Sequence, residues 1–415
     1  MVKLVPIVCV LALLASPLGR AADGGLTLAE AQRRAVERSR QLAGQDAAIA
    51  AAREMGVAAG QLPDPVLRLG VDNMPVTGED RYSLTRDSMT MRRIGVMQEI
   101  TRGEKRELRA QRFAREAERA AAEKDVTIAA IQRDTALAWL ERYYAEAMAA
   151  VLAEQAAQVR AEIAAAEGAY RGGRASQSDV IGAHATLAAL EERASEYASR
   201  ISIAKVNLAR WMGPGADAPL AAPPAMDKVR LEGGALEEHL ATHPEIVALE
   251  RQEKVAATEA RLAQALSKPD WSVEFAYQQR GSDFSNMVSF GVSIPLPWDR
   301  ANRQDRDVAA KLAQAEQARA QRDEVLRGHT GEVRAMLDEW QNKRERLGRY
   351  ERDLVPLTRE RSRAAAAAYQ GGRAGISELL LVRRGETDVR LQWVQLQSEA
   401  ARLWARLNYL IPEQQ

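Results

Sequence analysis

The stretch Ala169–Ala175, which reads AYRGGRA, decides the organisation of the chain because it returns almost unchanged as AYQGGRA at Ala368–Ala374. Further landmarks of the first half return in the same order in the second half: Trp139 as Trp340, and Leu208–Met212 as Leu407–Ile411. Solenoid repeats have periods of about 20 to 50 residues, and this repeat is far longer. The pattern therefore predicts two copies of one domain.

Each half has the same predicted order of elements. We expect a first repeat at 22–212, a Pro- and Gly-rich linker at 213–235 and a second repeat at 236–415. The first repeat is predicted to contain a helix at 28–61, strands near 66–72 and 91–99, a long helix at 104–170 and a helix at 178–212. The second is predicted to contain a helix at 236–267, strands near 271–278 and 287–294, a long helix at 302–369 and a helix at 377–410.

Local signals set several of these boundaries. Gly172 and Gly173 end the first long helix, because glycine readily adopts the left-handed conformation that closes a helix. Thr101 and Glu104 have the spacing of a capping box at its start. Pro356 lies inside the second long helix, and we expect a kink there.

The helix lengths match one another. At 1.5 Å per residue, the helix at 104–170 would reach about 100 Å. The helices predicted on either side of it would together have the same length when stacked end to end. The sequence therefore predicts a tall helical wall, with an apolar stripe at coiled-coil-like spacing along the long helix.

The strand segments alternate between apolar and small or polar residues. Trp271, Val273, Phe275 and Tyr277 alternate with polar or small neighbours, and 287–294 and 67–72 follow the same rule. This pattern is typical of transmembrane barrel strands, although a small soluble sheet packed on the helices remains an alternative. Four strands cannot close a barrel, and open sheet edges are not tolerated in lipid. Three copies would supply twelve strands, so we expect a homotrimer in contact with membrane lipid.

Composition excludes several classes of protein. The net charge of +1 gives no case for nucleic-acid binding. Residues 1–21 have the pattern of a signal peptide, with Lys3, an apolar core at 4–15 and small residues before a cleavage site after Ala21. Cleavage would remove Cys9, the only cysteine, which lies in a poor context for lipid attachment. We therefore expect neither disulfides nor cysteine chemistry in the mature chain.

These features together resemble the TolC family of outer-membrane efflux proteins. The likeness rests on the leader, the two halves, the inserted strand pairs, the two Tyr-x-Gly-Gly-Arg turns, and the segment His243–Ile246, which is similar to the family's Asn-Pro-Glu-Leu. The resemblance implies a mainly α-helical fold with a small β portion: a trimeric, twelve-stranded outer-membrane β-barrel that continues into a long periplasmic α-helical barrel. It also implies a periplasmic adaptor and an inner-membrane pump as partners.

Within the family, three segments resemble the heavy-metal-efflux branch, which works with metal-exporting pumps of the resistance-nodulation-division (RND) class. They are Pro63–Pro65, Asp72–Pro75, and Ser83–Asp87 followed by Met89–Met91. The alternatives are a channel for drugs or other organic compounds, a channel for type I secretion, a periplasmic adaptor, and a secreted coiled-coil protein.

The two Gly-Gly turns are the predicted adaptor-docking tips, because they end the helical wall far from the strands. Turn chemistry accounts for the glycines but not for an arginine and a tyrosine at equivalent places in both halves. The predicted docking residues are Tyr170, Gly172, Gly173 and Arg174 in the first repeat, and Tyr369, Gly371, Gly372 and Arg373 in the second.

Just beyond the tips, Asp179 and Glu378 are the predicted constriction of the channel entrance. Glu378 matches a position of the family's acidic ring, whereas the second acidic position of the family is Leu381 here. Carboxylates brought close together would favour cations. The alternative for both residues is an ordinary acidic side chain at a helix N-terminus.

Residues with metal or catalytic chemistry are sparse. His239 and His243 have helical i, i+4 spacing, but Pro244 disfavours a helix at His243, so we expect no metal site there. Met74, Met89, Met91 and Met97 could contact soft metals, but ordinary packing is the favoured interpretation. The sequence has no nucleophile elbow or phosphate loop. We therefore expect no enzymatic activity, no catalytic residues and no cofactor.

Overall fold

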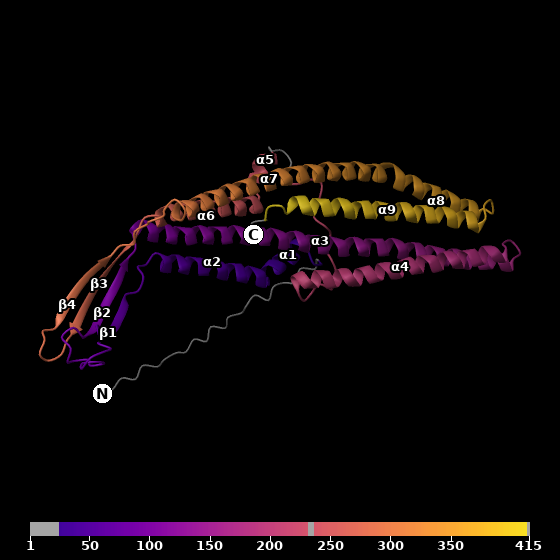
Figure 1. The fold of residues 1–415 in the computed structure, drawn as a ribbon. Helices are drawn as coiled ribbons and strands as arrows, with labels where there is room; N and C mark the ends of the chain where they lie inside the picture. The colour runs from indigo at the N-terminus through magenta and orange to yellow at the C-terminus, as the bar shows by residue number, and fades with distance from the viewer. Residues whose placement is uncertain (1–24, 231–235, 413–415) are drawn as a thin grey trace, which may run out of the picture.

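The computed structural model describes residues 25–230 and 236–412, and it has helices at one end and a sheet at the other (Figure 1). The predicted signal peptide at 1–21 lies outside the described residues, as does part of the predicted linker.

Both repeats contain the same series of elements. In the first repeat these are α1 (Leu28–Glu37), α2 (Arg40–Ala59), β1 (Val66–Asp72), β2 (Met91–Ile100), α3 (Gly103–Arg171) and α4 (Gln177–Met212). In the second they are α5 (Leu236–Ala241), α6 (Pro244–Leu266), β3 (Trp271–Gln279), β4 (Met287–Ser293), α7 (Gln304–Arg349), a π-helical turn (Tyr350–Leu354), α8 (Val355–Gln370) and α9 (Ile376–Asn408).

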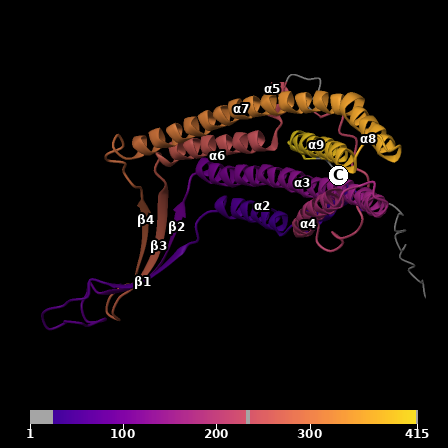
Figure 2. The same cartoon turned by 90° about the vertical axis from the view of Figure 1, so that its right-hand side faces the viewer.

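The helices form one curved layer of four columns (Figures 1 and 2). The first column is α2 followed by α4, the second is α3, the third is α6 followed by α9, and the fourth is α7 followed by α8. Contacts join α3 to α2, α4, α6 and α9, while α7 packs on α6 and α8 packs on α9. Each column continues into one strand, so the sheet extends the helical layer.

The core follows the long helix α3. Trp139, Leu140, Leu152 and Val159 of α3 are fully buried. Trp340 of α7, the counterpart of Trp139 in the second repeat, is also buried. Tyr144, Met148, Val151 and Ile163 of the predicted apolar stripe are buried too, which fits coiled-coil-like packing on several sides.

The predicted single helices at 28–61 and 236–267 were wrong, because a cap breaks each of them. Ser39 accepts a hydrogen bond from the backbone N–H of Leu42 and starts a new helix, α2. In the second repeat Pro244 is the first residue of α6, and His243 is its N-cap.

The predicted capping box of Thr101 and Glu104 does not form, because Thr101 Oγ1 donates to Glu99 and the second repeat contacts the start of the helix. The N-cap of α3 is Arg102, whose backbone N–H donates to Asp270 Oδ1 at 3.0 Å. Glu104 pairs with Lys268 at 2.8 Å instead. Lys105, buried beside them, donates to Asp270 Oδ2 at 2.7 Å. These contacts hold the start of α3 against the start of β3.

The kink expected at Pro356 takes the form of a π-helical turn directly before α8, and Figure 1 shows the bend between α7 and α8. Proline lacks an N–H donor and its ring clashes with the carbonyl four residues earlier, which in this helix belongs to Arg352. A π turn absorbs such a mismatch by adding a residue to the helix. The equivalent helix of the first repeat, α3, has no interruption over 69 residues.

The segment after α4 is folded onto the first repeat instead of being an open linker. Leu26 forms an isolated parallel bridge with Leu220, and its backbone N–H donates to Pro219 O at 2.7 Å. Trp139 Nε1 donates to Leu26 O at 3.1 Å, and the buried Arg142 donates to Ala216 O. The described part of the predicted linker therefore helps to cover the core.

Candidate functional site

The four strands form one antiparallel sheet in the order β1-β2-β3-β4, and the two strand pairs join through β2 and β3. The register brings apolar side chains into rows on one face. One row is Leu67, Val96, Phe275 and Phe290, and the next is Leu69, Ile94, Tyr277 and Val288. All eight side chains are exposed, Leu69 by 71% and Phe290 by 72%. An apolar patch of this extent marks a surface that another phase or another molecule covers.

The opposite face of the sheet is polar. The register places Arg68, Gly95, Ala276 and Ser289 in one row of this face. Arg68 pairs with Glu274 at 3.4 Å, and Arg93 forms a salt bridge with the same carboxylate. The alternation predicted from the sequence therefore separates one apolar face from one charged face.

The two predicted tips lie together at the far end of the helices from the sheet (Figure 1). At the first tip, the N–H of Arg174 donates to Ala169 O at 2.8 Å, and Gly173 has φ +72°. At the second, the N–H of Arg373 donates to Ala368 O at 2.8 Å, and Gly372 has φ +68°. Both turns are Schellman motifs, which require a left-handed residue at the position that Gly173 and Gly372 occupy.

The side chains of the tips are mostly open to solvent. Arg174 and Arg373 are exposed, and Tyr170 is 47% exposed. Tyr369 is less exposed, and partial burial, together with the nearby carboxylates of Glu162 and Asp179, raises the pKa of its hydroxyl. The turn geometry requires glycine at two positions but needs neither arginine, so the arginines are available to bind a partner.

The structure brings Asp179 into contact with the second repeat. Its Oδ2 accepts from Ser176 Oγ at 2.8 Å in a complete capping box, and its Oδ1 accepts from Ser377 Oγ at 2.8 Å. The hydrogen bonds from Ser176 and then Ser377 lower the pKa of this carboxyl. Glu378 is the equivalent residue of α9, whose N-cap, Gly375, provides no side-chain cap, and both Glu378 and Leu381 are exposed.

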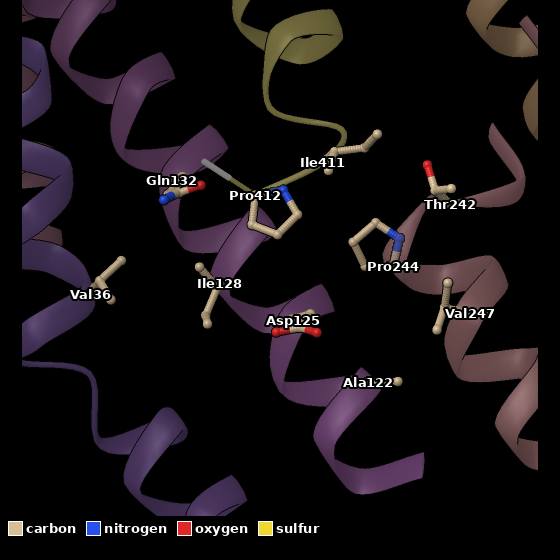
Figure 3. Close-up of a pocket in the computed structure, with 10 residues that line it drawn as sticks. All are labelled: Val36, Ala122, Asp125, Ile128, Gln132, Thr242, Pro244, Val247, Ile411 and Pro412. Carbon is tan, nitrogen blue, oxygen red and sulfur yellow. The ribbon is translucent and has the colours of Figure 1, made fainter. Parts of the chain in front are cut away.

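A cavity of about 390 Å³ lies midway along the helical layer (Figure 3). It is lined by Val36 of α1, by four residues of α3, by Thr242, Pro244 and Val247 around the start of α6, and by Ile411 and Pro412 after α9. Asp125 is the one charged residue in this lining. None of the site residues predicted from the sequence lies in it.

A group of potential metal ligands that the sequence did not predict lies beside this cavity. It contains His243, Glu245 and His329, whose ligand atoms are all within 4.8 Å of one another. His239, the partner suggested by helical spacing, is not part of the group, because α5 ends at Ala241 before His243. Burial and the neighbouring His329 lower the pKa of His243 to about 4.

The methionines do not form a shared site with these histidines. Met74 and Met89 are exposed in the loop between β1 and β2, and Met97 Sδ accepts a hydrogen bond from Arg68 Nη2 at 3.1 Å. None of the helices in the described part of the chain contains an apolar stretch of the length that a membrane span needs.

Comparison with known proteins identifies the fold. No family model matches the chain, and no curated protein matches it by sequence. Solved structures do match. The outer membrane protein VceC of Vibrio cholerae aligns with a TM-score of 0.75 and 21% identity over 92% of this chain and 95% of its own. This chain has the TolC-like channel fold.

Two further structures agree with this result. The outer membrane channel MtrE of Neisseria gonorrhoeae aligns with a TM-score of 0.76 and 16% identity over 93% of this chain and 89% of its own. CusC, studied for transmembrane channel formation, aligns with a TM-score of 0.77 and 15% identity over 93% of this chain and 92% of its own. The scores of the three are nearly equal, so they single out no branch of these channels.

Proposed function

We propose that the chain is the outer-membrane channel of a tripartite efflux system, a passive exit duct without enzymatic activity. The observation that carries this proposal is the four-stranded sheet, which has an exposed apolar face and continues the columns of a long helical layer. The TolC-like fold supports the same function.

The duct requires a homotrimer. Within the described chain, β1 and β4 each pair on one side only, which leaves two sheet edges. Lipid does not tolerate such edges, because their backbone groups would have no hydrogen-bond partners. Three copies close a twelve-stranded barrel, and the four helical columns of each copy close a helical barrel below it. The apolar face then contacts outer-membrane lipid, and the face with Arg68, Arg93 and Glu274 lines the lumen.

Tryptophans mark the boundary between the two barrels. Trp298, after β4, is 93% exposed, and Trp271 at the start of β3 is 41% exposed. Tryptophan is enriched at membrane–water interfaces, where its ring contacts both the apolar and the polar region. The helical barrel therefore begins at the membrane surface and extends into the periplasm.

The tips at the other end of the helices dock a periplasmic adaptor, which links the duct to an inner-membrane pump of the RND class. The exposed arginines beside each Gly-Gly turn supply this contact. A trimer presents two tips per chain, all at the same end.

For the cargo, we propose heavy-metal cations. The support is the resemblance of Pro63–Pro65, Asp72–Pro75, and Ser83–Asp87 followed by Met89–Met91 to the heavy-metal-efflux branch. The structure places these segments before β1 and in the loop between β1 and β2. They therefore lie toward the barrel, away from the tips.

The channel proposal is tested by fractionation and conductance. The chain, expressed in a Gram-negative host, should enter the outer membrane, require detergent for extraction, migrate as a heat-sensitive trimer and form conducting pores in planar bilayers. A monomer that stays soluble without detergent and keeps its sheet would contradict the proposal.

The cargo is tested separately. A host that lacks its own channel should gain resistance to copper, silver, zinc or cobalt when it expresses this chain together with a periplasmic adaptor and a metal-exporting pump of the RND class. Resistance to dyes or antibiotics without resistance to metals would favour a channel for organic compounds instead.

A further inference from the structure

His243, Glu245 and His329 converge where α6 begins, beside the middle of α7. His243 is the N-cap of α6, Glu245 lies in the first turn of α6, and His329 lies on the neighbouring helix α7. The two imidazole rings are edge to face with centroids 5.0 Å apart. His329 Nε2 lies 3.2 Å from Glu245 Oε2.

The burial of these groups is uneven, as in a site that opens to solvent on one side. The His243 side chain is buried, His329 is 20% exposed and Glu245 is 47% exposed. One ring nitrogen of His243, Nδ1, accepts a long hydrogen bond of 3.3 Å from the backbone N–H of Glu245. The helix cap and the Glu245–His329 pair account for single contacts, but neither accounts for two imidazoles and a carboxylate at one point.

We propose that His243, Glu245 and His329 bind one divalent transition-metal ion of the zinc type. Two imidazole nitrogens and one carboxylate oxygen suit zinc and its neighbours in the first transition row. Calcium and magnesium prefer sites made of oxygen alone, and silver or copper(I) prefers sulfur. Three protein ligands leave a fourth position of a tetrahedral ion for water.

The geometry requires only a small adjustment. Bonds from zinc to nitrogen or oxygen are about 2.0 to 2.2 Å long, so ligand atoms on one tetrahedral ion are separated by roughly 3.4 Å. The ligand atoms here lie within 4.8 Å of one another. A bound ion would require this difference to be closed, and the half-exposed Glu245 side chain and the partly exposed His329 ring are the groups that could rotate to do so.

Two local charges act on a bound cation in opposite directions. The N-terminus of α6 carries partial positive charge, which disfavours a cation. The Glu245 carboxylate, a full negative charge in the first turn, outweighs this half charge. A bound ion would also connect α6 to α7. This link would lie beside the break between α5 and α6, where Pro244 starts a new helix.

The experiment uses the purified full-length protein in detergent, stripped with a chelator and then titrated with zinc(II) or cobalt(II). We expect one ion per chain, a cobalt spectrum of low coordination number, and a higher unfolding temperature with zinc, because a ligand of the folded state stabilises it. His329→Gln should weaken zinc binding by about a hundred-fold, since second-shell losses alone already cost 10- to 100-fold.

Two further variants keep the test decisive. His243→Asn removes a ligand but keeps a strong N-cap, so it should fold and fail to bind. His239→Gln changes the nearby histidine outside the group and should bind zinc as the native chain does. Absence of stoichiometric binding by the native chain, or equal binding by the native chain and His329→Gln, would overturn the proposal. The inference does not rest on transport, because no pump or adaptor is needed for the measurement.

Discussion

Ser377 Oγ donates a hydrogen bond of 2.8 Å to Asp179 Oδ1, and this contact joins the first turn of α9 to the first turn of α4. The two residues belong to different repeats and lie directly beyond the two Gly-Gly turns. Asp179 is already fixed by its capping box with Ser176. The contact therefore links the hairpin of α8 and α9 to Asp179 on the hairpin of α3 and α4, at the end predicted to be the channel entrance.

Loss of this hydrogen bond should loosen the entrance. The hydrogen bond joins the two hairpins at this end, so Ser377→Ala should shift an opening equilibrium toward the open state. Single-channel recordings would show longer or more frequent openings. Ser178→Ala, the change at the equivalent serine of the first repeat, is the matched control, and identical effects of the two variants would refute the prediction.

Neutralising Glu378 should reduce cation preference. In a trimer, three exposed Glu378 side chains would surround the entrance and raise the local cation concentration. Glu378→Gln should lower the cation-to-anion permeability ratio measured from reversal potentials in a salt gradient. Glu192→Gln removes the same charge from an exposed site on α4 and should leave the ratio unchanged. An unaltered ratio in Glu378→Gln would assign this residue only to the helix N-terminus.

Reversing the charge of the tips should disrupt the docking of the adaptor. Charge reversal in an interface costs several kcal/mol when like charges meet. The double variant Arg174→Glu and Arg373→Glu should therefore weaken co-purification with the adaptor about ten-fold or more while the trimer still forms. Arg327→Glu, at an exposed position midway along α7, controls for net charge. Undiminished co-purification would place the docking surface elsewhere.

The two faces of the sheet should respond oppositely to the same substitution. Phe290 lies on the apolar face, and Ser289 beside it lies on the polar face. An arginine at mid-bilayer on a lipid-facing position costs about 2–4 kcal/mol, whereas lumen-facing positions tolerate charge. Phe290→Arg should reduce the amount of trimer in the outer membrane, and Ser289→Arg should leave the trimer intact but change its conductance. The reverse outcome would mean that the apolar face lines the lumen.

The carboxylate of Glu259 should make stability depend on pH. It lies on α6, 2.8 Å from Arg112 of α3 and 2.8 Å from Lys311 of α7. Burial raises its pKa, but the two cations outweigh burial and lower the pKa below 4.5. The unfolded state then binds the proton first, so the stabilisation is complete above pH 4.5 and is lost as the pH falls through the lowered value.

Glu259→Gln should therefore unfold at a lower temperature than the native chain at neutral pH, because its free energy of unfolding is smaller by about 1 kcal/mol. This difference should vanish in strong acid. Thermal unfolding of the detergent-purified protein at a series of pH values measures this. Glu332→Gln, at an exposed site on α7, should change neither the unfolding temperature nor its dependence on pH. A difference that is constant with pH would show that Glu259 acts through packing alone.

The features that the sequence predicted correctly depend on neighbouring residues. Gly173 and Gly372 end their helices through turns completed within six residues, and the alternation around Phe275 and Phe290 needs only the period of a strand. The Arg174 and Arg373 assignments stay predictions, because the structure contains no partner for them.

The features that the sequence did not predict depend on contacts between distant segments. Asp270 of the second repeat takes over the start of α3, so the capping box expected from Thr101 has no role. His329 joins His243 only because α6 and α7 lie side by side, whereas i, i+4 spacing pointed to His239. The break at Ser39 shows the reverse case, in which a local cap interrupts a segment whose composition favours one helix.

The π turn at Tyr350–Leu354 makes the two repeats unequal, since α3 passes the same level without interruption. In a ring of three chains, the straight helix α3 would alternate around the circumference with the bent column of α7 and α8. Such a ring has true threefold but only approximate sixfold symmetry. A cap of six identical subunits could not sit on it with six equivalent contacts, and its subunits would have to bind as three pairs of unlike neighbours.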